Sequence, residues 1–235
     1  MKQYAKQIRW GAAIIVLIAM TVAAFLLGRA QQARQALPPG AEHRQTRQHV
    51  LYLTLDRTKA PIIVLGDSIV EAATLPPSAC GHALVNAGLS GASTASDLDD
   101  FLKQALGANR RFAIIVSLGA NDALSDAPGS AEVFAGRYEA LLRELSKLTN
   151  RIYFLEIPPV EAREQTTPDM AKAVMATIGR YRATLPELAR RTGATLLQWP
   201  GTQEAPFTVD GVHLNAEGYR AWNEAIERGT ALACR

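Results

Sequence analysis

The stretch IIVLGDSIVEAA, residues 62–73, sets the fold and raises the first functional question. Its apolar start is typical of a buried strand, and Gly66, Asp67 and Ser68 follow directly. A serine in this position is commonly a helix cap or turn residue, because its hydroxyl can bond nearby backbone N–H groups. The same position can instead hold a nucleophile at the tip of a strand. The stretch by itself leaves both roles open.

Short apolar runs and helical patterns alternate through the rest of the chain. The runs lie at residues 62–65, 83–85, 112–118, 152–157 and 194–199. Helices are expected at residues 94–107, at 131–148, from Thr167-Pro168 to a kink or break at Pro186, and at about 215–229. Because the strand segments are continuously apolar, the pattern predicts an α/β fold with a parallel sheet covered on both faces.

Polar motifs occur where these runs end. They are GDS (66–68), NAGLSG (86–91), GAND (119–122) and, before the last helix, DGVH (210–213). In open parallel sheets, ligands bind beyond the carboxyl ends of the strands. The motifs supply a serine, backbone N–H groups beside glycines, a side-chain amide and an Asp/His pair. Acyl transfer needs these parts.

Other catalytic signatures are missing from the sequence. It has no G-x-S-x-G elbow, no phosphate-binding glycine loop and no cluster with metal-ligand spacing. His43 and His49 fall in a polar segment and His82 is isolated, so we expect all three to lie outside any site. No cofactor or metal is expected.

The four motifs, in order and spacing over residues 61–230, resemble the SGNH (GDSL-type) hydrolase and esterase superfamily. The resemblance implies a flavodoxin-like three-layer α/β/α sandwich with a central parallel sheet. It also implies a catalytic triad in which Ser68 is the nucleophile, His213 the base and Asp210 the residue that orients the base. The oxyanion hole would combine the backbone N–H groups of Ser68 and Gly91 with the side-chain amide of Asn121.

The remaining motif positions are assigned structural roles. Asp67 would organise the turn, and Gly88 would meet a turn requirement rather than act as a donor. Ala120 and Leu214 stand where many relatives have other residues, and neither change removes a catalytic atom.

We therefore expect a serine esterase that hydrolyses a carboxylic ester, acyl or acetyl, through an acyl-enzyme. The substrate can be a small-molecule, lipid or glycan ester. One alternative is an envelope polysaccharide O-acyltransferase that uses the same site. A second is a non-catalytic domain that binds carbohydrate or a protein partner.

The distribution of charge argues against a nucleic-acid partner. Residues 1–35 contain five basic residues and no acid, which leaves 20 basic against 22 acidic residues in the remainder. The high pI therefore belongs to the N-terminal segment, and the body has no basic stripe.

That N-terminal segment predicts a membrane anchor. Residues 11–28 are uncharged, follow three basic residues and would span roughly 27 Å as a helix, close to the thickness of a hydrocarbon core. We expect residues 1–10 to form a cytoplasmic tail, 11–28 a transmembrane signal-anchor, 29–58 a linker and 59–235 the exported (periplasmic) catalytic domain. Secretion after signal-peptide cleavage near Ala30 is the alternative.

Cys80 and Cys234 are the only cysteines, an even count that suits an oxidising compartment. The sequence leaves open whether they form a disulfide or remain two thiols.

Overall fold

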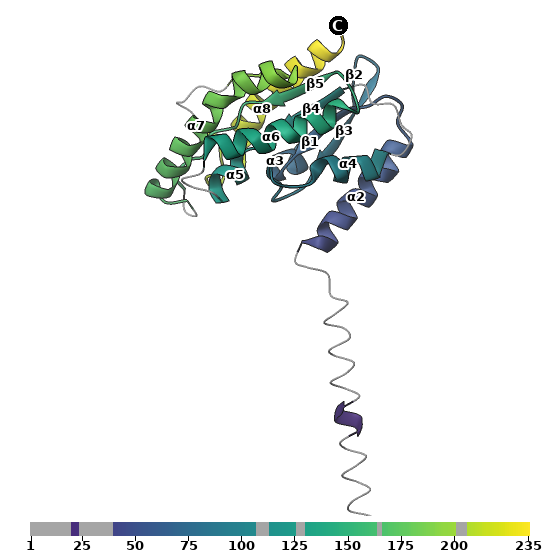
Figure 1. Ribbon diagram of the computed structural model, residues 1–235, viewed down its shortest axis with the longest axis horizontal. Helices are drawn as coiled ribbons and strands as arrows, with labels where there is room; N and C mark the ends of the chain where they lie inside the picture. The colour runs from purple at the N-terminus through teal and green to yellow at the C-terminus, as the bar shows by residue number, and fades with distance from the viewer. Residues whose placement is uncertain (1–19, 24–39, 107–112, 126–129, 164–165, 201–205) are drawn as a thin grey trace, which may run out of the picture. The chain divides into compact units, whose positions relative to one another are not determined.

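The computed structural model describes residues 20–23, 40–106, 113–125, 130–163, 166–200 and 206–235. Its centre is a six-stranded sheet in the order β2-β3-β1-β4-β5-β6 (Figure 1). The strands are β1 (Ile62–Gly66), β2 (Ser78–Ala79), β3 (His82–Gly88), β4 (Ala113–Ser117), β5 (Ile152–Leu155) and β6 (Thr195–Leu197). Neighbouring strands pair in parallel, apart from the short β2, which runs antiparallel to β3.

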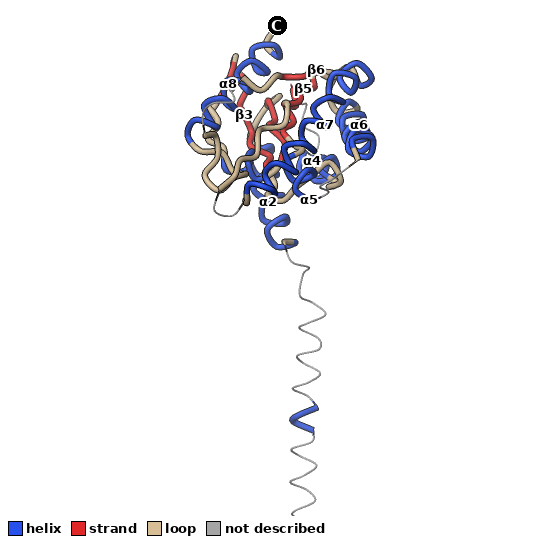
Figure 2. Tube along the Cα trace, turned by 90° about the vertical axis from the view of Figure 1, so that its left-hand side faces the viewer, coloured by secondary structure: helices blue, strands red, loops and turns tan. Residues whose placement is uncertain are grey.

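Helices lie on both faces of this sheet (Figure 2). They are α2 (Ala41–Asp56), α3 (Ser68–Ala72), α4 (Leu98–Leu106), α5 (Ala120–Ser125), α6 (Ala131–Ser146), α7 (Pro168–Thr192) and α8 (Ala216–Ala233). Successive strand side chains point to opposite faces. Ile62 and Val64 pack with residues of α3 and α8, whereas Ile63 and Leu65 pack with residues of α2, α4, α6 and α7.

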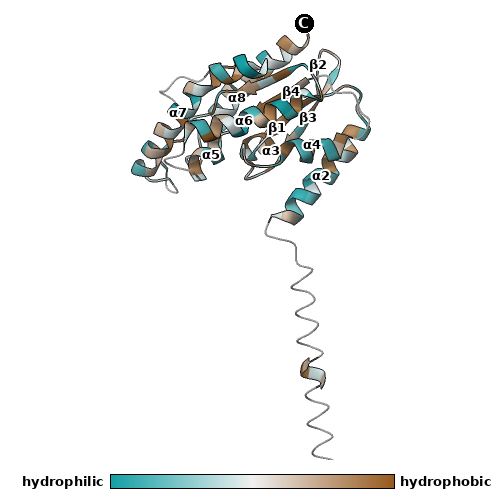
Figure 3. Ribbon diagram, viewed as in Figure 1, coloured by the Kyte–Doolittle hydropathy of each residue, from teal (hydrophilic) through white to brown (hydrophobic). Residues whose placement is uncertain are grey.

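The predicted fold is confirmed. Without the short edge strand β2, the strand order is the flavodoxin-like one, with the first long strand in the second place. The central strands β1, β4 and β5 are mainly hydrophobic, as Figure 3 shows, and buried along their length because both faces are covered. This explains why continuous apolar runs, rather than alternating ones, marked the strands in the sequence.

The expectation of a linker over residues 29–58 is wrong for its second half, where the structure has helix α2. The first half of the helix is polar, and its apolar residues gather at positions 50–55. Leu51 and Leu55, one turn apart, are buried at 2% and 0% exposure in the core on one face of the sheet. The folded body therefore begins before residue 59.

Two helix boundaries also differ from the prediction. Helix α4 begins at Leu98 rather than near Thr94, because the backbone N–H and hydroxyl of Thr94 bond to the carboxylate of Asp122. Helix α7 runs through Pro186 without a break, from its cap at Thr167 to Gly193 in the left-handed conformation.

The predicted membrane segment, residues 11–28, lies outside the described residues except for 20–23. Within the described ranges, no helix is long and apolar enough to cross a membrane. The anchor and the cytoplasmic tail stay predictions.

A disulfide joins Cys80 to Cys234, with 6.3 Å between their Cα atoms. Cys80 lies in the turn between β2 and β3, and Cys234 caps the C-terminal end of α8. The two cysteines are 154 residues apart in the sequence, and the closed loop includes β3, β4, β5 and β6 but not β1 or β2. The bond therefore ties the last helix to the edge of the sheet.

We predict that replacing both cysteines, by Cys80→Ser with Cys234→Ser, lowers the free energy of unfolding by about 2–5 kcal/mol, because the unfolded chain regains the entropy that the closed loop removes. Urea unfolding followed by circular dichroism measures the loss. Wild-type protein in excess reductant is the matched control and should show the same midpoint as the variant. An unchanged midpoint would contradict the prediction.

Candidate active site

The Ser68 side chain is presented at the carboxyl edge of the sheet by a tight strand-to-helix junction. β1 ends at Gly66, and α3 begins at Ser68. A side chain at residue 66 would collide with the backbone carbonyl of Ser117 on β4, so only glycine fits there. Asp67 caps α3 by accepting a hydrogen bond of 2.9 Å from the Ile69 N–H. The serine is thus held at the first position of the helix.

His213 connects Ser68 to Asp210 through two hydrogen bonds. The Ser68 Oγ lies 3.0 Å from His213 Nε2, and His213 Nδ1 lies 2.6 Å from Asp210 Oδ2. The carboxylate accepts a hydrogen bond from Nδ1–H, and in this tautomer Nε2 carries no hydrogen and can accept a hydrogen bond from the serine hydroxyl. The structure therefore brings together the three residues that the motifs singled out, in the order that nucleophilic catalysis requires.

The Asp210 carboxylate also shapes the loop that carries the histidine. Its Oδ1 accepts hydrogen bonds from the N–H groups of Val212 (3.0 Å) and His213 (2.8 Å). Burial alone would raise the pKa of Asp210, but the bonds from the His213 ring and from these N–H groups outweigh it and lower the pKa to about 2. The carboxylate is therefore ionised at any pH at which the enzyme would work.

Glu161, which the sequence analysis missed, holds this loop from the other side. Its carboxylate accepts hydrogen bonds from the N–H groups of Phe207 and Thr208, both at 2.9 Å, and from the Thr208 hydroxyl at 2.5 Å. Its own N–H donates to the Gly211 carbonyl at 2.8 Å. The one feature of the sequence that could have identified Glu161 is its position shortly after the fourth apolar run, residues 152–157. A residue there is expected at the same edge of the sheet as the motifs.

The loops after β3 and β4 reach this edge next to Ser68. Gly91 lies in the loop after β3 and has a positive φ of 77°. Asn121 lies in the first turn of α5, and its Nδ2 donates to the carbonyl of Ala92 at 2.9 Å. This bond joins the two loops and fixes the orientation of the Asn121 amide. The two non-serine positions of the predicted oxyanion hole are therefore neighbours.

Two buried carboxyl groups lie behind the site. Asp67 is 2% exposed, and burial raises its pKa to about 7, against the opposing effects of the Ile69 N–H and of His213. Asp122 is 3% exposed, and burial likewise raises its pKa, although Thr94 donates hydrogen bonds to it. Asp67 belongs to the motif but has no hydrogen bond to Ser68 Oγ among those that the structure describes. It organises the turn, as expected.

This geometry agrees with a comparison of the sequence with known families. A match to a family described as GDSL-like lipase/acylhydrolase spans residues 64–221, from β1 to α8. The chain belongs to this family. Members of this family hydrolyse carboxylic esters, and this is the reaction class of the chain. The family assignment agrees with the resemblance inferred from the four motifs.

Solved structures of the same fold include several GDSL-like acylhydrolases. A protein from Streptococcus pneumonia, provisionally named a platelet activating factor, aligns with a TM-score of 0.67 and 23% identity over 89% of this chain and 99% of that one. A GDSL-like lipase from Bacteroides thetaiotaomicron aligns at 0.58 and 16% identity (79% and 98% of the chains). A catalytic mutant of an acetylxylan esterase from Geobacillus stearothermophilus aligns at 0.55 and 17% identity (74% and 94%). The search of curated protein sequences gave no match.

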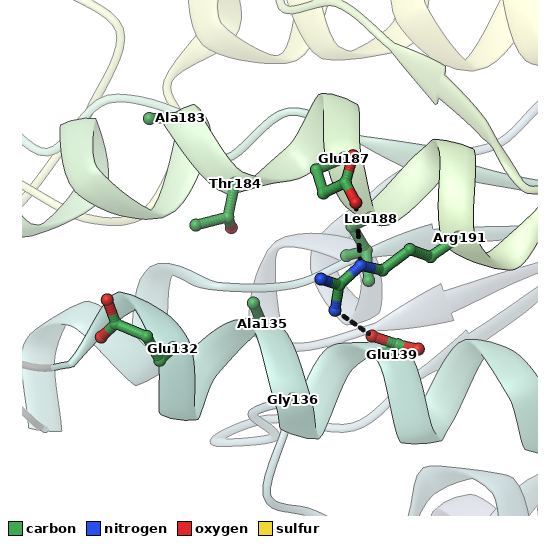
Figure 4. A pocket seen from close by; sticks show the side chains of 9 residues that line it. All are labelled: Glu132, Ala135, Gly136, Glu139, Ala183, Thr184, Glu187, Leu188 and Arg191. Carbon is green, nitrogen blue, oxygen red and sulfur yellow. Dashed lines mark hydrogen bonds and ion pairs between the residues drawn. The ribbon is translucent and has the colours of Figure 1, made fainter.

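A groove between α6 and α7 lies apart from the acylhydrolase motifs (Figure 4). Its volume is about 410 Å³, and Arg191 crosses it with ion pairs to Glu187 at 2.9 Å and Glu139 at 3.3 Å. None of Ser68, Asp210 and His213 lines it. Exposed pairs of this kind contribute little free energy, and the groove takes no part in the site.

For this acylhydrolase we predict that Glu161→Gln lowers kcat about tenfold, because a neutral amide holds the Asp210–His213 loop less firmly than a carboxylate does and a small displacement of a catalytic group is costly. Steady-state hydrolysis of p-nitrophenyl acetate measures it. Glu156→Gln is the matched control, because Glu156 accepts a backbone hydrogen bond at 3.0 Å from Trp199, away from the catalytic loop. Equal kcat values for the two variants would argue against this role of Glu161.

The raised pKa of Asp67 predicts a pH-dependent stability. The folded protein keeps this proton up to about pH 7, whereas the unfolded chain releases it near the ordinary value of 3.8, so the free energy of unfolding falls as the pH rises between these values. Asp67→Asn should remove this loss and be more stable than wild type at pH 8, by up to about 4 kcal/mol, with little advantage at pH 4. Thermal unfolding at both pH values measures the difference. A constant difference across the range would be inconsistent with a buried proton on Asp67.

Proposed function

We propose that the protein is a serine esterase that works through a Ser68–His213–Asp210 triad and an acyl-enzyme intermediate. The observation that carries the proposal is the continuous hydrogen-bond chain from Ser68 Oγ to His213 Nε2 at 3.0 Å and from His213 Nδ1 to Asp210 at 2.6 Å. A cap or turn serine needs no imidazole beside it. A histidine held in this tautomer by a carboxylate is suited to remove the serine proton.

In the acylation step, Ser68 Oγ attacks the ester carbonyl carbon while His213 Nε2 takes the hydroxyl proton. Asp210, ionised because of its low pKa, stabilises the imidazolium that forms. When the tetrahedral intermediate collapses, the C–O bond to the alcohol breaks, and His213 gives its proton to the departing alcohol oxygen. Ser68 is left carrying the acyl group.

We assign the oxyanion hole to the N–H groups of Ser68 and Gly91 and the side-chain amide of Asn121. An amide nitrogen carries two N–H groups, and the bond to Ala92 uses one of them. That bond fixes the plane of the amide in advance, so the second N–H can donate to the oxyanion without reorganisation. Fixed donors of this kind lower the barrier of acyl transfer more than any other single device.

In the second step, water attacks the acyl group with His213 as base, and Ser68 regains its proton. The His213 side chain is 48% exposed, so water has access to the base. This openness favours hydrolysis over acyl transfer to a sugar hydroxyl, because a transferase must keep water from its acyl-enzyme.

We propose small acyl esters as the substrates, with an acetylated glycan as the first class to test. The acetylxylan esterase among the structures of the same fold supports this choice, and so does the open site. Lipid esters are the second class, which the GDSL-like lipase supports.

We further propose that the catalytic domain works outside the cytoplasm. The Cys80–Cys234 disulfide supports this location, because such bonds persist in oxidising compartments. The uncharged segment of residues 11–28 would hold the domain at the membrane.

The first test is labelling of the full chain, in detergent, with a fluorophosphonate probe and mapping of the adduct by peptide mass. We expect an adduct on Ser68 that His213→Ala abolishes and that Ser146→Ala, a serine change on α6, leaves intact.

Asn121→Ala should fold normally and lose about 10²–10³ in kcat, the cost of one oxyanion donor. A folded protein without an adduct would overturn the proposal, and wild-type turnover in Asn121→Ala would remove Asn121 from the oxyanion hole.

A further inference from the structure

One side chain of α2, Arg47, reaches the carboxyl edge of the sheet. Its Nε donates to the Gly88 carbonyl at 3.0 Å, and its Nη2 lies 3.2 Å from Asn86 Oδ1 and 3.4 Å from the Asn86 carbonyl. Gly88 is the last residue of β3, and the chain continues from it into the loop that carries Gly91. The guanidinium therefore binds the start of that loop at several points. Arg47 precedes residue 64, where the family match begins.

Glu71 extends the contact to α3, the helix that carries Ser68. The Arg47 Nε lies 3.6 Å from Glu71 Oε1, and the two side chains are only 21% and 19% exposed. The other carboxylate oxygen of Glu71 accepts hydrogen bonds from the Ser90 N–H at 2.6 Å and the Ser90 hydroxyl at 2.7 Å. Ser90 is the residue immediately before Gly91, so this bond acts directly beside the proposed oxyanion donor.

Close packing makes the loop depend on these contacts. A side chain at residue 88 would collide with the backbone of Val70 and Glu71, so the end of β3 lies directly against α3. Asn86 closes the same junction, since its Nδ2 donates to the Val70 carbonyl at 2.6 Å. The separation between the Ser68 and Gly91 N–H groups is therefore set where Arg47, Glu71 and Asn86 meet.

We infer that Arg47 is a positioning residue of the oxyanion hole, acting with Glu71 to hold the loop of residues 86–91 against the helix that begins at Ser68. The inference rests on the proposed function. Arginine suits this task because its planar fork binds two carbonyl oxygens and a carboxylate at once, which a lysine ammonium does not match. The helix that precedes the family match thereby becomes part of the catalytic arrangement.

The test compares Arg47→Ala, Arg47→Lys and Glu71→Gln in the full chain, with p-nitrophenyl acetate as substrate. We expect Arg47→Ala to lower kcat about 10- to 100-fold with KM within about twofold, because displaced donors weaken transition-state binding but not ground-state binding. Arg47→Lys should keep the charge but recover only part of the rate, and millimolar guanidinium should partly rescue Arg47→Ala alone. Arg57→Ala is the matched control, since Arg57 directly follows the last residue of the same helix, is exposed and, among the contacts described, bonds only to the Leu53 carbonyl.

Amide hydrogen exchange gives a readout that does not depend on activity. Peptides covering residues 86–92 should exchange faster in Arg47→Ala than in wild type or Arg57→Ala, whereas peptides of the central β4 should not change. If Arg47→Ala does not fold, Arg47→Lys and Glu71→Gln still test the inference. Each should raise the rate of amide exchange in the same peptides.

The outcomes separate the two claims. If wild type hydrolyses no ester and its Ser68 takes no probe, the proposed function fails, and exchange alone decides whether Arg47 holds the loop. If wild type is active, an unchanged kcat, a change in KM alone or unchanged loop exchange overturns the inference. A tenfold or larger loss of kcat with faster loop exchange supports it.

Discussion

The position of the proposed catalytic groups depends on the pairing of β1 with its two neighbours. Gly66, the last residue of β1, lies opposite Gly88 of β3 and opposite Ser117 of β4. Because all three strands run in parallel and end at the same level, the segments that follow them leave the sheet side by side. Ser68, Gly91 and Asn121 each lie within a few residues of such an end. The register of one central strand thus sets where the proposed nucleophile and oxyanion donors lie.

Polar side chains then fix the loops that leave this edge. Asn86 binds the end of α3, Asp122 binds Thr94 in the connection to α4, and Glu161 binds the loop that precedes Asp210. Hydrogen bonds between neutral groups contribute about 1 kcal/mol each and those to charged groups about 1.5–3 kcal/mol, so a few of them together can hold an irregular loop. Loops without secondary structure of their own are held in this way to the precision that catalysis needs.

This arrangement buries three ionisable side chains near the site, and their desolvation costs folding free energy. Asp67 and Asp122 are buried, and their burial disfavours the ionised forms. The Tyr138 hydroxyl, also buried, has no hydrogen-bond partner among the described residues, and burial together with the two carboxylates raises the pKa of Tyr138 well above its ordinary value. Buried ionisable groups of this kind are common near functional sites, and Asp67 directly precedes Ser68 and interacts with His213. The proposed base itself stays accessible, with about half of the His213 side chain open to solvent.

The sequence by itself determined the layered fold and the identity of the catalytic candidates. Continuous apolar runs such as residues 62–65 predict buried parallel strands, and parallel strands bring the motifs after them to one edge. Helix α2 escaped prediction because residues 41–49 are polar and the apolar run that follows, VLYLTL (50–55), is short enough to fit a helix or a strand. Tertiary structure alone decided that Cys80 meets Cys234, that Thr94 bonds to Asp122 rather than starting α4, that Arg47 binds the Gly88 carbonyl and that Glu161 binds the Thr208 N–H. Local sequence patterns show the period of each helix or strand and the chemistry of each motif. The contacts named above join residues that are far apart in the chain. Only the folded backbone determines which distant residues come into contact.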